Sequence, residues 1–395
     1  MAYDISYDHL VGWEADLCLL TERVTAGLFT RPEPRATFAD LVRGLLADVP
    51  RKNSWLLAEH VGHGSAYRLE WLLGGAKWDA DILRDRVRDY VVDTLGAEDG
   101  VLIADDTQVI KKGDKSVGVA PQHCGATGQT ENCQVLPMLA YASGCGHAFI
   151  DRALYLPRRW TDDPQRCAQA GVPAERGFLT KPQLVVEMLD RALAAGVSFR
   201  YFTADSGYGR DPGLRARCHA CVVSYVLAVP VDLPLIAPDG TATRPDLVLA
   251  AVPKTVWERR SCGQGTKGER YYDWAAITVT VNNQPPADGY AHTLLVRRSV
   301  ADPSELEFFL AHAPEPTPIP ELIAVAGMRW KIEENNGQGK DLLGLDQYQV
   351  RKWTPWHRHV TACMLAHAFL AATRANLGSA NLGKPHPPQE VVAAR

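Results

Sequence analysis

The chain has 395 residues, of which 46% are hydrophobic, and it carries a formal net charge of −4. That length and apolar content indicate a globular protein with a sizeable core and room for two or three domains. The negative balance excludes a uniformly basic surface, and the absence of a Walker phosphate loop, a dinucleotide fingerprint and a nucleophile elbow leaves ATPases, dehydrogenases and serine hydrolases without support.

Residues 1–95 are predicted to form a helical N-terminal domain. The first clear helix has apolar residues at helical spacing, and later segments with the same period cover 55–61, 67–73 and 79–95. The spaced apolar residues of the first helix are Phe38, Leu41, Val42, Leu45 and Leu46.

Residues 96–222 alternate between strand and helix patterns, which predicts an α/β unit. A helix is expected near 181–195. The expected strands cover 101–105, 116–120, 132–142, 148–154 and 199–204.

The pattern changes between residues 223 and 321 to short β-like runs separated by Gly and Pro clusters, at 225–229, 271–281 and 292–298, which predicts a β-rich insertion. Residues 322–375 are expected to be helical again. The apolar stretch 360–372 is too short to span a membrane and carries His367, so a core helix is expected. The Gly-, Pro- and Ala-rich tail, 376–395, is expected to be disordered.

Two aspartates follow the predicted strands at the same kind of position. Asp105 comes directly after the apolar run 101–104, and Asp205 follows 199–204. Ligands of open α/β sheets bind at the carboxyl ends of the strands, so both carboxylates are well placed to hold a metal ion. Each also fits an ordinary role as a turn or helix cap, since Thr107 and Ser206 follow closely.

A third acid lies between two cations. Arg329, Glu333 and Lys340 are separated by four and then seven residues, which places all three on one helix face. Taken alone, Arg329 and Glu333 could be a surface ion pair. Together with Asp105 and Asp205, however, three carboxylates from distant segments supply the oxygen ligands that Mg²⁺ or Mn²⁺ requires.

The order Asp105, Asp205, Glu333, with Arg329 and Lys340 around the glutamate, resembles the DDE transposases of bacterial insertion sequences. The resemblance is to the branch whose signature is Tyr-x2-Arg-x3-Glu-x6-Lys. Further segments similar to this family extend it over most of residues 35–372; they are 51–62, 111–119, 125–135, 154–163 and 344–371.

The resemblance implies an RNase H-like α/β catalytic core interrupted by the β-rich insertion 223–321, closed by the helices of 322–375 and preceded by a DNA-end-binding domain at 1–95. It also implies that Asp105, Asp205 and Glu333 are catalytic and hold two Mg²⁺ or Mn²⁺ ions. The implied reaction is cut-and-paste transposition, in which water cleaves the transposon ends and the freed 3′-hydroxyl attacks target DNA. Arg329 and Lys340 would contact phosphate near the scissile bond.

Two of the three acids each have an acidic neighbour in the sequence, and chemistry alone does not decide which member of the pair is the metal ligand. Asp105 and Asp106 point to opposite faces of a strand, so only one can face the metal, and Glu333 and Glu334 pose the same problem on a helix. The family pattern Asp-x-Thr favours Asp105, and the seven-residue step to Lys340 favours Glu333.

The chain departs from the family at three places. Ala326 stands where the signature has tyrosine, and Asn335-Asn336-Gly337-Gln338-Gly339 replaces a stronger helix-forming stretch. After the first acid the chain reads Thr107-Gln108-Val109-Ile110, where the family more often has Thr-Gly followed by a bulky or acidic residue and Leu. Two glycines inside a helix cost about 1 kcal/mol each relative to alanine; either tertiary packing carries that cost or the helix is looser or interrupted there. These features favour an alternative: a decayed or domesticated copy that binds DNA without cutting it. A metal-dependent nuclease without strand transfer is the other alternative.

Phosphate neutralisation supplies most of the non-specific affinity of a protein for DNA, and the net charge of this chain is −4. DNA contact is therefore expected to come from local basic patches. The expected contacts are Lys111, Lys112, Arg351 and Lys352, with Arg158-Arg159, Arg259-Arg260 and the aromatic and basic segment 353–359 as further candidates. The expected partners are double-stranded transposon ends and target DNA, bound by a homodimer because both ends must be cut together; no membrane partner is expected.

Nine cysteines form no regular framework, and no secretory segment is recognisable at the N-terminus, so a reducing cytoplasm, with the protein associated with the bacterial nucleoid, is expected. Cys218-His219-Ala220-Cys221 could seed a zinc site, but it lacks a second ligand pair at zinc-finger spacing.

Overall fold

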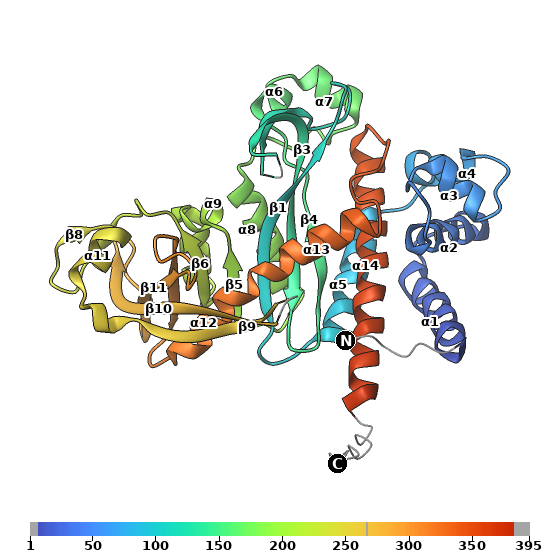
Figure 1. The fold of residues 1–395 in the computed structure, drawn as a ribbon. Coiled ribbons are helices and arrows are strands. Elements are labelled where there is room, and N and C mark those ends of the chain that lie inside the picture. Colours follow the sequence, from blue (N-terminus) through green and yellow to red (C-terminus); the bar gives the residue numbers. More distant parts are fainter. Residues whose placement is uncertain (1–6, 126, 266–267, 383–395) are drawn as a thin grey trace, which may run out of the picture.

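The protein is described by a computed structural model over residues 7–125, 127–265 and 268–382. One large mixed sheet runs through the molecule, with helices on both of its faces (Figure 1). The helices α1–α4 lie beyond α5 and α14 at one side, and the strands around β10 and β11 lie at the opposite end.

The N-terminal region is helical, as predicted. Asn53 and Asp79 cap two of its helices by accepting backbone N–H groups with their side chains. Phe38, Leu41 and Leu45, predicted at helical spacing, are fully buried. The helices are α1 (Tyr7–Thr25), α2 (Pro32–Leu46), α3 (Ser54–His60), α4 (Tyr67–Gly74) and α5 (Ala80–Leu95).

The sheet contains twelve strands in the described residues, in the order β2-β3-β1-β5-β6-β12-β11-β10-β7-β8, with β4 paired to β3 and β9 paired to β10. β1 is parallel to β5, and β5 to β6. The remaining pairings are antiparallel. The strands of the first half are β1 (Val101–Ile110), β2 (Ala120–Cys124), β3 (Gln129–Ala142), β4 (His147–Arg152), β5 (Tyr201–Ala204) and β6 (Tyr225–Val229).

The strand at 225–229 does not belong to a separate insertion. It is β6, bonded in parallel to β5 and in antiparallel to β12, so the later strands extend the same sheet. Periodicity alone cannot show this, because a buried apolar run looks the same wherever it pairs. The later strands are β7 (Leu235–Ile236), β8 (Ala242–Thr243), β9 (Glu258–Gly265), β10 (Gly268–Val281), β11 (Tyr290–Arg298) and β12 (Leu306–Pro314).

The remaining helices lie around the sheet. In the middle of the chain they are α6 (Arg158–Thr161), α7 (Pro164–Ala170), α8 (Lys181–Ala194), α9 (Ser206–Gly209), α10 (Pro212–Ala220), α11 (Pro245–Ala251) and the 3₁₀ turn η1 (Lys254–Val256). At the end they are α12 (Ile319–Met328), α13 (Trp330–Asp341) and α14 (Trp353–Leu382).

Several boundaries differ from the sequence predictions, and three examples follow. β1 continues five residues past Asp105 to Ile110, because β3 pairs with it along its whole length. The strand expected at 116–120 begins only at Ala120. The helix α14 runs to Leu382, into the segment expected to be disordered; residues 383–395 lie outside the described part. Among the described helices, none is long and apolar enough to cross a membrane.

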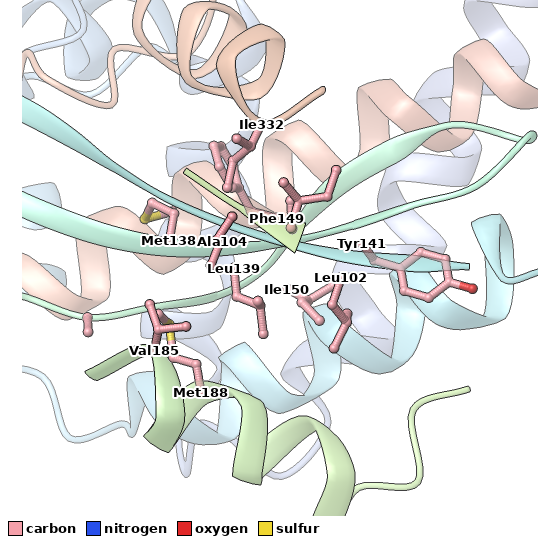
Figure 2. Packing of buried hydrophobic residues seen from close by; sticks show 14 of the residues in the cluster. Leu102, Ala104, Met138, Leu139, Tyr141, Phe149, Ile150, Val185, Met188 and Ile332 are labelled. Carbon is pink, nitrogen blue, oxygen red and sulfur yellow. The ribbon is translucent and has the colours of Figure 1, made fainter. Parts of the chain in front are cut away.

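The core places α13 and α8 on opposite faces of the sheet. Figure 2 shows Ile332 of α13 on one side of β1 and β3, and Val185 and Met188 of α8 on the other. All three side chains are fully buried. The apolar run that ends at Ala104 is thus enclosed from both faces, which fixes the position of the polar residues that follow it.

The helix α14 joins the N-terminal helices to the sheet. The Arg358 guanidinium donates to the Leu73 carbonyl at 3.0 Å and also to the carbonyl of Trp78. Trp356 is fully buried and donates through Nε1 to the Tyr348 hydroxyl at 3.0 Å. The prediction that segment 353–359 grips DNA is therefore wrong for Trp356 and Arg358, which are core residues.

A buried ion-pair network ties α5, β4 and α8 together. Asp151 is 4% exposed and accepts from Arg191 Nε at 2.8 Å, with Arg84 Nε at 3.8 Å. Beside it, Arg152 pairs with Asp81 at 2.8 Å. Because a buried cation that loses its partner keeps its desolvation cost, this network holds the helices to the sheet more firmly than surface pairs would.

We expect Asp151→Ala to lower the free energy of unfolding by about 2 kcal/mol, because Arg191 loses its carboxylate and the buried Arg84 loses one of its partners, keeping only Asp81 and Asp85. The matched control is Asp190→Ala, whose partner Arg217 lies at 2.7 Å but in an exposed pair; its cost should stay below about 1 kcal/mol. Urea denaturation of both variants measures the difference. Equal costs would show that burial does not set the strength of the Asp151 network.

Candidate active site

Asp105 lies on β1 at the point where β5, the parallel neighbour of β1, ends. The pairing of β1 with β5 stops at Ala104 and Ala204, while β1 continues beside β3 with Asp105 opposite Met138. The Asp105 carboxylate accepts the backbone N–H of Asp106 at 2.7 Å. With no β5 residue beyond Ala204 to pair with, Asp105 lies at the edge at which α/β sheets bind ligands.

Asp205 follows β5 at the same edge and caps the short helix α9. Its Oδ1 accepts the Tyr208 N–H at 3.1 Å, so the capping role considered for it is present. Gly209 at the end of α9 packs onto β6 so closely that a Cβ there would lie 1.9 Å from the Ala228 carbonyl oxygen. The capped turn is therefore pressed onto the sheet and fixes Asp205 beside Asp105.

Glu333 lies on the first turn of α13 and pairs with Arg329 at 2.7 Å. The helix is continuous through Gly337 and Gly339, so tertiary packing carries the cost of the two glycines and the segment is not interrupted. At Gly339 a Cβ would lie 3.1 Å from Leu345 and 3.6 Å from Phe149. A bulkier residue would require Leu345 to shift by a few tenths of an ångström, so the glycine allows α13 to pack closely at this point.

The structure brings the three predicted acids together. Asp105, Asp205 and Glu333 come from β1, the end of β5 and α13, and they line one cavity of about 900 Å³. The other residues that line it are Asp106, Gln108, Gln122, His123, Gly125, Tyr155, Lys181, Pro182, Gly207, Tyr208 and Asn336.

The electrostatics of the cavity favour a cation. Burial, followed by the charges of Asp205 and Asp106, raises the pKa of Asp105 to about 8. Burial also raises the pKa of Asp205, although the Tyr208 N–H partly offsets it. Four carboxylates with two paired cations, Lys181 and Arg329, leave two negative charges in excess when all are ionised. A divalent ion with oxygen ligands fits both this charge and this donor set.

Asp106 has a different environment from Asp105. Its carboxylate pairs with Lys181 Nζ at 2.7 Å and accepts from the Gln108 amide; the Tyr208 hydroxyl lies at 3.5 Å. Both Asp105 and Asp106 line the cavity, but Asp106 is paired with a lysine, whereas Asp105 is in no ion pair among the described residues. Of the two glutamates, Glu333 lines the cavity and pairs with Arg329, whereas Glu334 does not line it and pairs with His147 and Lys331.

None of the predicted DNA-contacting residues lines this cavity. Arg329 pairs with Glu333, which does, and it lines a separate cavity of about 410 Å³ together with Asp205. Lys111 makes an internal contact: its Nζ lies 3.6 Å from the centre of the Tyr348 ring and donates to the Tyr348 carbonyl at 3.0 Å. Burial lowers the pKa of Lys111 to about 8. Lys112 is exposed, and Lys340 lies on the last turn of α13.

Arg351 and Lys352 belong to a second cavity, of about 480 Å³, between α7 and the start of α14. Three more cations line it, and Arg166 among them stacks over the Trp160 ring at 3.8 Å. In the described part of the chain, neither Arg351 nor Lys352 pairs with a carboxylate, whereas Arg259 and Arg260 both do. The lining residues are Asp114, Lys115, Arg159, Trp160, Asp163, Gln165, Arg166, Gln169, Ala170, Arg351 and Lys352.

Sequence reasoning missed three residues of the acidic cavity: Lys181, Tyr208 and Asn336. Asn336 lies three residues after Glu333 and so shares its helix face; its Oδ1 is buried without a hydrogen-bond partner. That spacing could have identified Asn336. No sequence signal connects Lys181 with Asp106, because their contact joins elements 75 residues apart.

Comparison with protein families matches residues 26–281 to the DDE superfamily endonucleases. The chain belongs to this family. The matched range contains Asp105 and Asp205 and ends before Glu333, and it confirms the resemblance to DDE transposases.

Among curated proteins, the chain is similar to a "Probable transposase for insertion sequence element IS701" of Microchaete diplosiphon, with 29% identity over 169 residues. The match covers 42% of this chain and 41% of that relative. Among solved structures, a piggyBac transposase in a synaptic complex with hairpin DNA matches 91% of this chain and 69% of its own, with a TM-score of 0.47 and 12% identity.

Away from the acidic cavity, this DDE-family chain gathers three histidines: His219 of α10, His292 of β11 and His312 of β12. Their possible ligand atoms lie within 4.8 Å of one another. The His219 and His312 rings, however, stack at 3.9 Å and 17°, and a metal must lie near the plane of each ring that binds it. The cluster is therefore a stack of neutral aromatic rings rather than a metal centre.

The cysteines beside His219 do not form a zinc site either. Burial raises the pKa of Cys218 to about 12, which disfavours the thiolate that zinc requires. No cysteine among the described residues joins a group of three potential ligands.

Because His292 is 1% exposed and neither ring nitrogen has a hydrogen-bond partner, we expect His292→Leu to raise the free energy of unfolding by about 1 kcal/mol at neutral pH. Burial, followed by His312, His219 and Arg215, lowers the pKa of His292 to about 3. The unfolded chain binds a proton at this residue near pH 6.5 and the folded chain does not, so the wild type loses stability as pH falls below about 6.5.

The advantage of His292→Leu should therefore widen by about 1.4 kcal/mol for each pH unit below about 6. Urea denaturation at roughly pH 7 and pH 5 measures it, and the exposed His60→Leu serves as the control. If wild type and His292→Leu lose stability in parallel, His292 does not remain neutral in the folded state.

Proposed function

We propose that this chain is a DNA transposase that cleaves transposon ends in a metal-dependent reaction and joins the freed ends to target DNA. The observation that carries the proposal is the meeting of Asp105, Asp205 and Glu333 in one cavity, from positions at least 100 residues apart in the chain. Membership of the DDE superfamily endonucleases supports the nuclease part. Cut-and-paste strand transfer extends the proposal beyond the family match.

Asp105, Asp205 and Glu333 would hold the divalent metal, Mg²⁺ or Mn²⁺. Two such ions supply a clamp on the attacking and leaving oxygens of a phosphodiester. The protein holds the carboxylates in place before DNA arrives, through the cap at Asp205, the Asp106 N–H on Asp105 and the Arg329 pair on Glu333. The Arg329 guanidinium, beside the acids, would also place positive charge near a bound phosphate.

The domain roles follow the resemblance. The strands around β1, β5 and β6, with the helices α12–α14, would form the RNase H-like core, and the β-rich insertion would begin after β6 rather than at 223. The N-terminal helices of 1–95 would bind the terminal inverted repeats. A homodimer would bridge two transposon ends, since both must be cut together.

The second cavity would supply a path for DNA. Arg351 and Lys352 are exposed, and Lys115, Arg159 and Arg166 line the same cavity, so five cations lie together on a chain whose net charge is negative. Phosphate contacts of this kind position a duplex without reading its sequence. Lys112 and Lys340 remain predicted DNA contacts, and Lys111, held against Tyr348, would act from a half-buried position.

The first test is cleavage of duplex DNA that carries the flanking ends of the coding sequence, with Mg²⁺ or Mn²⁺, by wild type and by Asp205→Asn. Asparagine can still cap α9 but supplies no charge to the metal, so we expect at least a hundredfold loss of cleavage with little change in stability. Asp211→Asn is the matched control: Asp211 caps the next helix, accepting the Leu214 N–H at 2.8 Å, and does not line the cavity.

Cleavage by wild type and Asp211→Asn, but not by Asp205→Asn, supports the proposal. A folded wild type that binds the ends but never cleaves them would favour a decayed, DNA-binding copy. Cleaved ends that are never joined to target DNA would favour a nuclease without strand transfer.

Replacing Arg351 and Lys352 together by alanine should weaken DNA binding at all sequences alike. Each lost phosphate contact should lower the slope of log affinity against log salt by about 1, so the double variant should lose about 2. The control is the double variant Arg259→Ala and Arg260→Ala, which removes the same charge from cations already paired with Asp273 and Glu258. Salt titrations of binding by fluorescence anisotropy measure the slopes; equal slopes for both double variants would remove the second cavity from the DNA path.

A further inference from the structure

The face of α13 that points away from the acidic cavity is polar and largely buried. Glu333 and Asn336 line the cavity, whereas Glu334 and Asn335 turn toward β4. Asn335 is fully buried. A buried polar helix face requires hydrogen-bond partners, and a single side chain of β4 supplies them.

That side chain is His147, at the start of β4. Its Nδ1 lies 2.5 Å from Asn335 Oδ1, and its Nε2 lies 3.1 Å from Glu334 Oε2. Lys331 holds the same Glu334 oxygen at 3.0 Å. One imidazole therefore bridges two consecutive residues of α13, immediately after Glu333.

The bridge connects the third acid to the sheet that carries the first. β4 pairs with β3, and β3 pairs with β1 over the residues around Asp105. Because β3 is bonded to both strands, a rigid path runs from Asp105 through the sheet to His147, and from His147 to the residues next to Glu333.

The sequence of α13 makes such a bridge necessary. Its segment 335–339 holds two asparagines and two glycines, each among the weaker helix formers, and an isolated helix of this composition would be marginal. One further tether lies a turn later, where His367 Nε2 is 3.2 Å from Gln338 Oε1. The helix is thus held by contacts to β4 and α14 rather than by its own propensity.

We propose that His147 is a positioning residue that fixes the register and tilt of α13, so that Glu333 faces Asp105 and Asp205 and completes the metal site. This inference rests on the proposed function, because it assigns the three acids to a metal. His147 itself does not line the cavity and touches neither metal nor DNA in this role.

The test is Mn²⁺ binding to the full chain without DNA, followed by electron paramagnetic resonance, for wild type, His147→Ala and His147→Gln. Removing a residue that orients a metal ligand typically weakens affinity ten- to a hundredfold, so we expect His147→Ala to bind Mn²⁺ roughly tenfold more weakly. Glutamine can still donate to Asn335 or to Glu334, so His147→Gln should restore most of the affinity.

The control is His312→Ala, which removes another buried histidine, in β12, outside the acidic cavity. It should lower thermal stability without moving the Mn²⁺ affinity. If His147→Ala does not fold, Glu334→Gln takes its place: it keeps the size of the side chain, removes the charge held by His147, and should weaken Mn²⁺ in the same direction.

Weaker Mn²⁺ binding in His147→Ala, with rescue by His147→Gln, supports the inference. Unchanged Mn²⁺ affinity in His147→Ala or Glu334→Gln overturns it while leaving the proposed function intact. A wild type that binds Mn²⁺ through His147-dependent geometry but never cleaves DNA overturns the proposed function alone, and a wild type that does not bind Mn²⁺ overturns both.

Discussion

The rest of the site depends on one constraint: four carboxylates of like charge are held together in one partly buried cavity. Asp105, Asp106, Asp205 and Glu333 repel one another, and burial, followed by the charges of Asp205 and Asp106, raises the pKa of Asp105 from 3.8 to about 8. A shift of that size corresponds to a penalty on the order of 5 kcal/mol. Such a cluster persists only where the surrounding structure over-determines the position of each acid.

A different structural feature holds each of the three acids Asp105, Asp205 and Glu333 in place. Asp105 belongs to a strand paired along its whole length with β3, so its backbone cannot shift without breaking the sheet. Asp205 is fixed by its capped turn, which Gly209 allows to pack tightly on β6. Glu333 depends on the least secure element, a helix rich in Asn and Gly whose stability comes from contacts to β4 and α14. The third acid is therefore the one whose position is most sensitive to changes elsewhere.

The sequence was sufficient for features that depend on local pattern. The N-terminal helices and the helix at 181–194 follow from periodicity. The three acids were singled out by their combination and by the family resemblance, and they line one cavity, while their catalytic role stays a prediction. The sequence could not predict features that depend on contacts between distant segments of the chain. The parallel pairing of β6 with β5, the Lys181 partner of Asp106 and the burial of Trp356 all arise from tertiary contacts, which a single sequence does not encode in any local pattern.

The Asn- and Gly-rich segment of α13 forms a helix although its composition disfavours one. Glycine at 339 allows close approach to Phe149 and Leu345, and the Asn335 side chain makes a buried hydrogen bond with His147. Of the two outcomes expected for this segment, the one in which tertiary packing offsets the low helix propensity is therefore confirmed.

The negative net charge and a DNA substrate are compatible because the two kinds of charge are separated in space. Many of the arginines are neutralised in ion pairs, as at Arg84, Arg191 and Arg259. Acids gather at the edge of the sheet, where a metal would offset them, while unpaired cations gather beside α7 and the start of α14. At physiological ionic strength charges farther apart than about 8 Å are largely screened, so DNA would respond to the local basic surface rather than to the total of −4. On the proposed function, the approach of DNA to the acidic cavity would depend on the basic cavity holding the duplex first, since bare carboxylates repel phosphate until a cation lies between them.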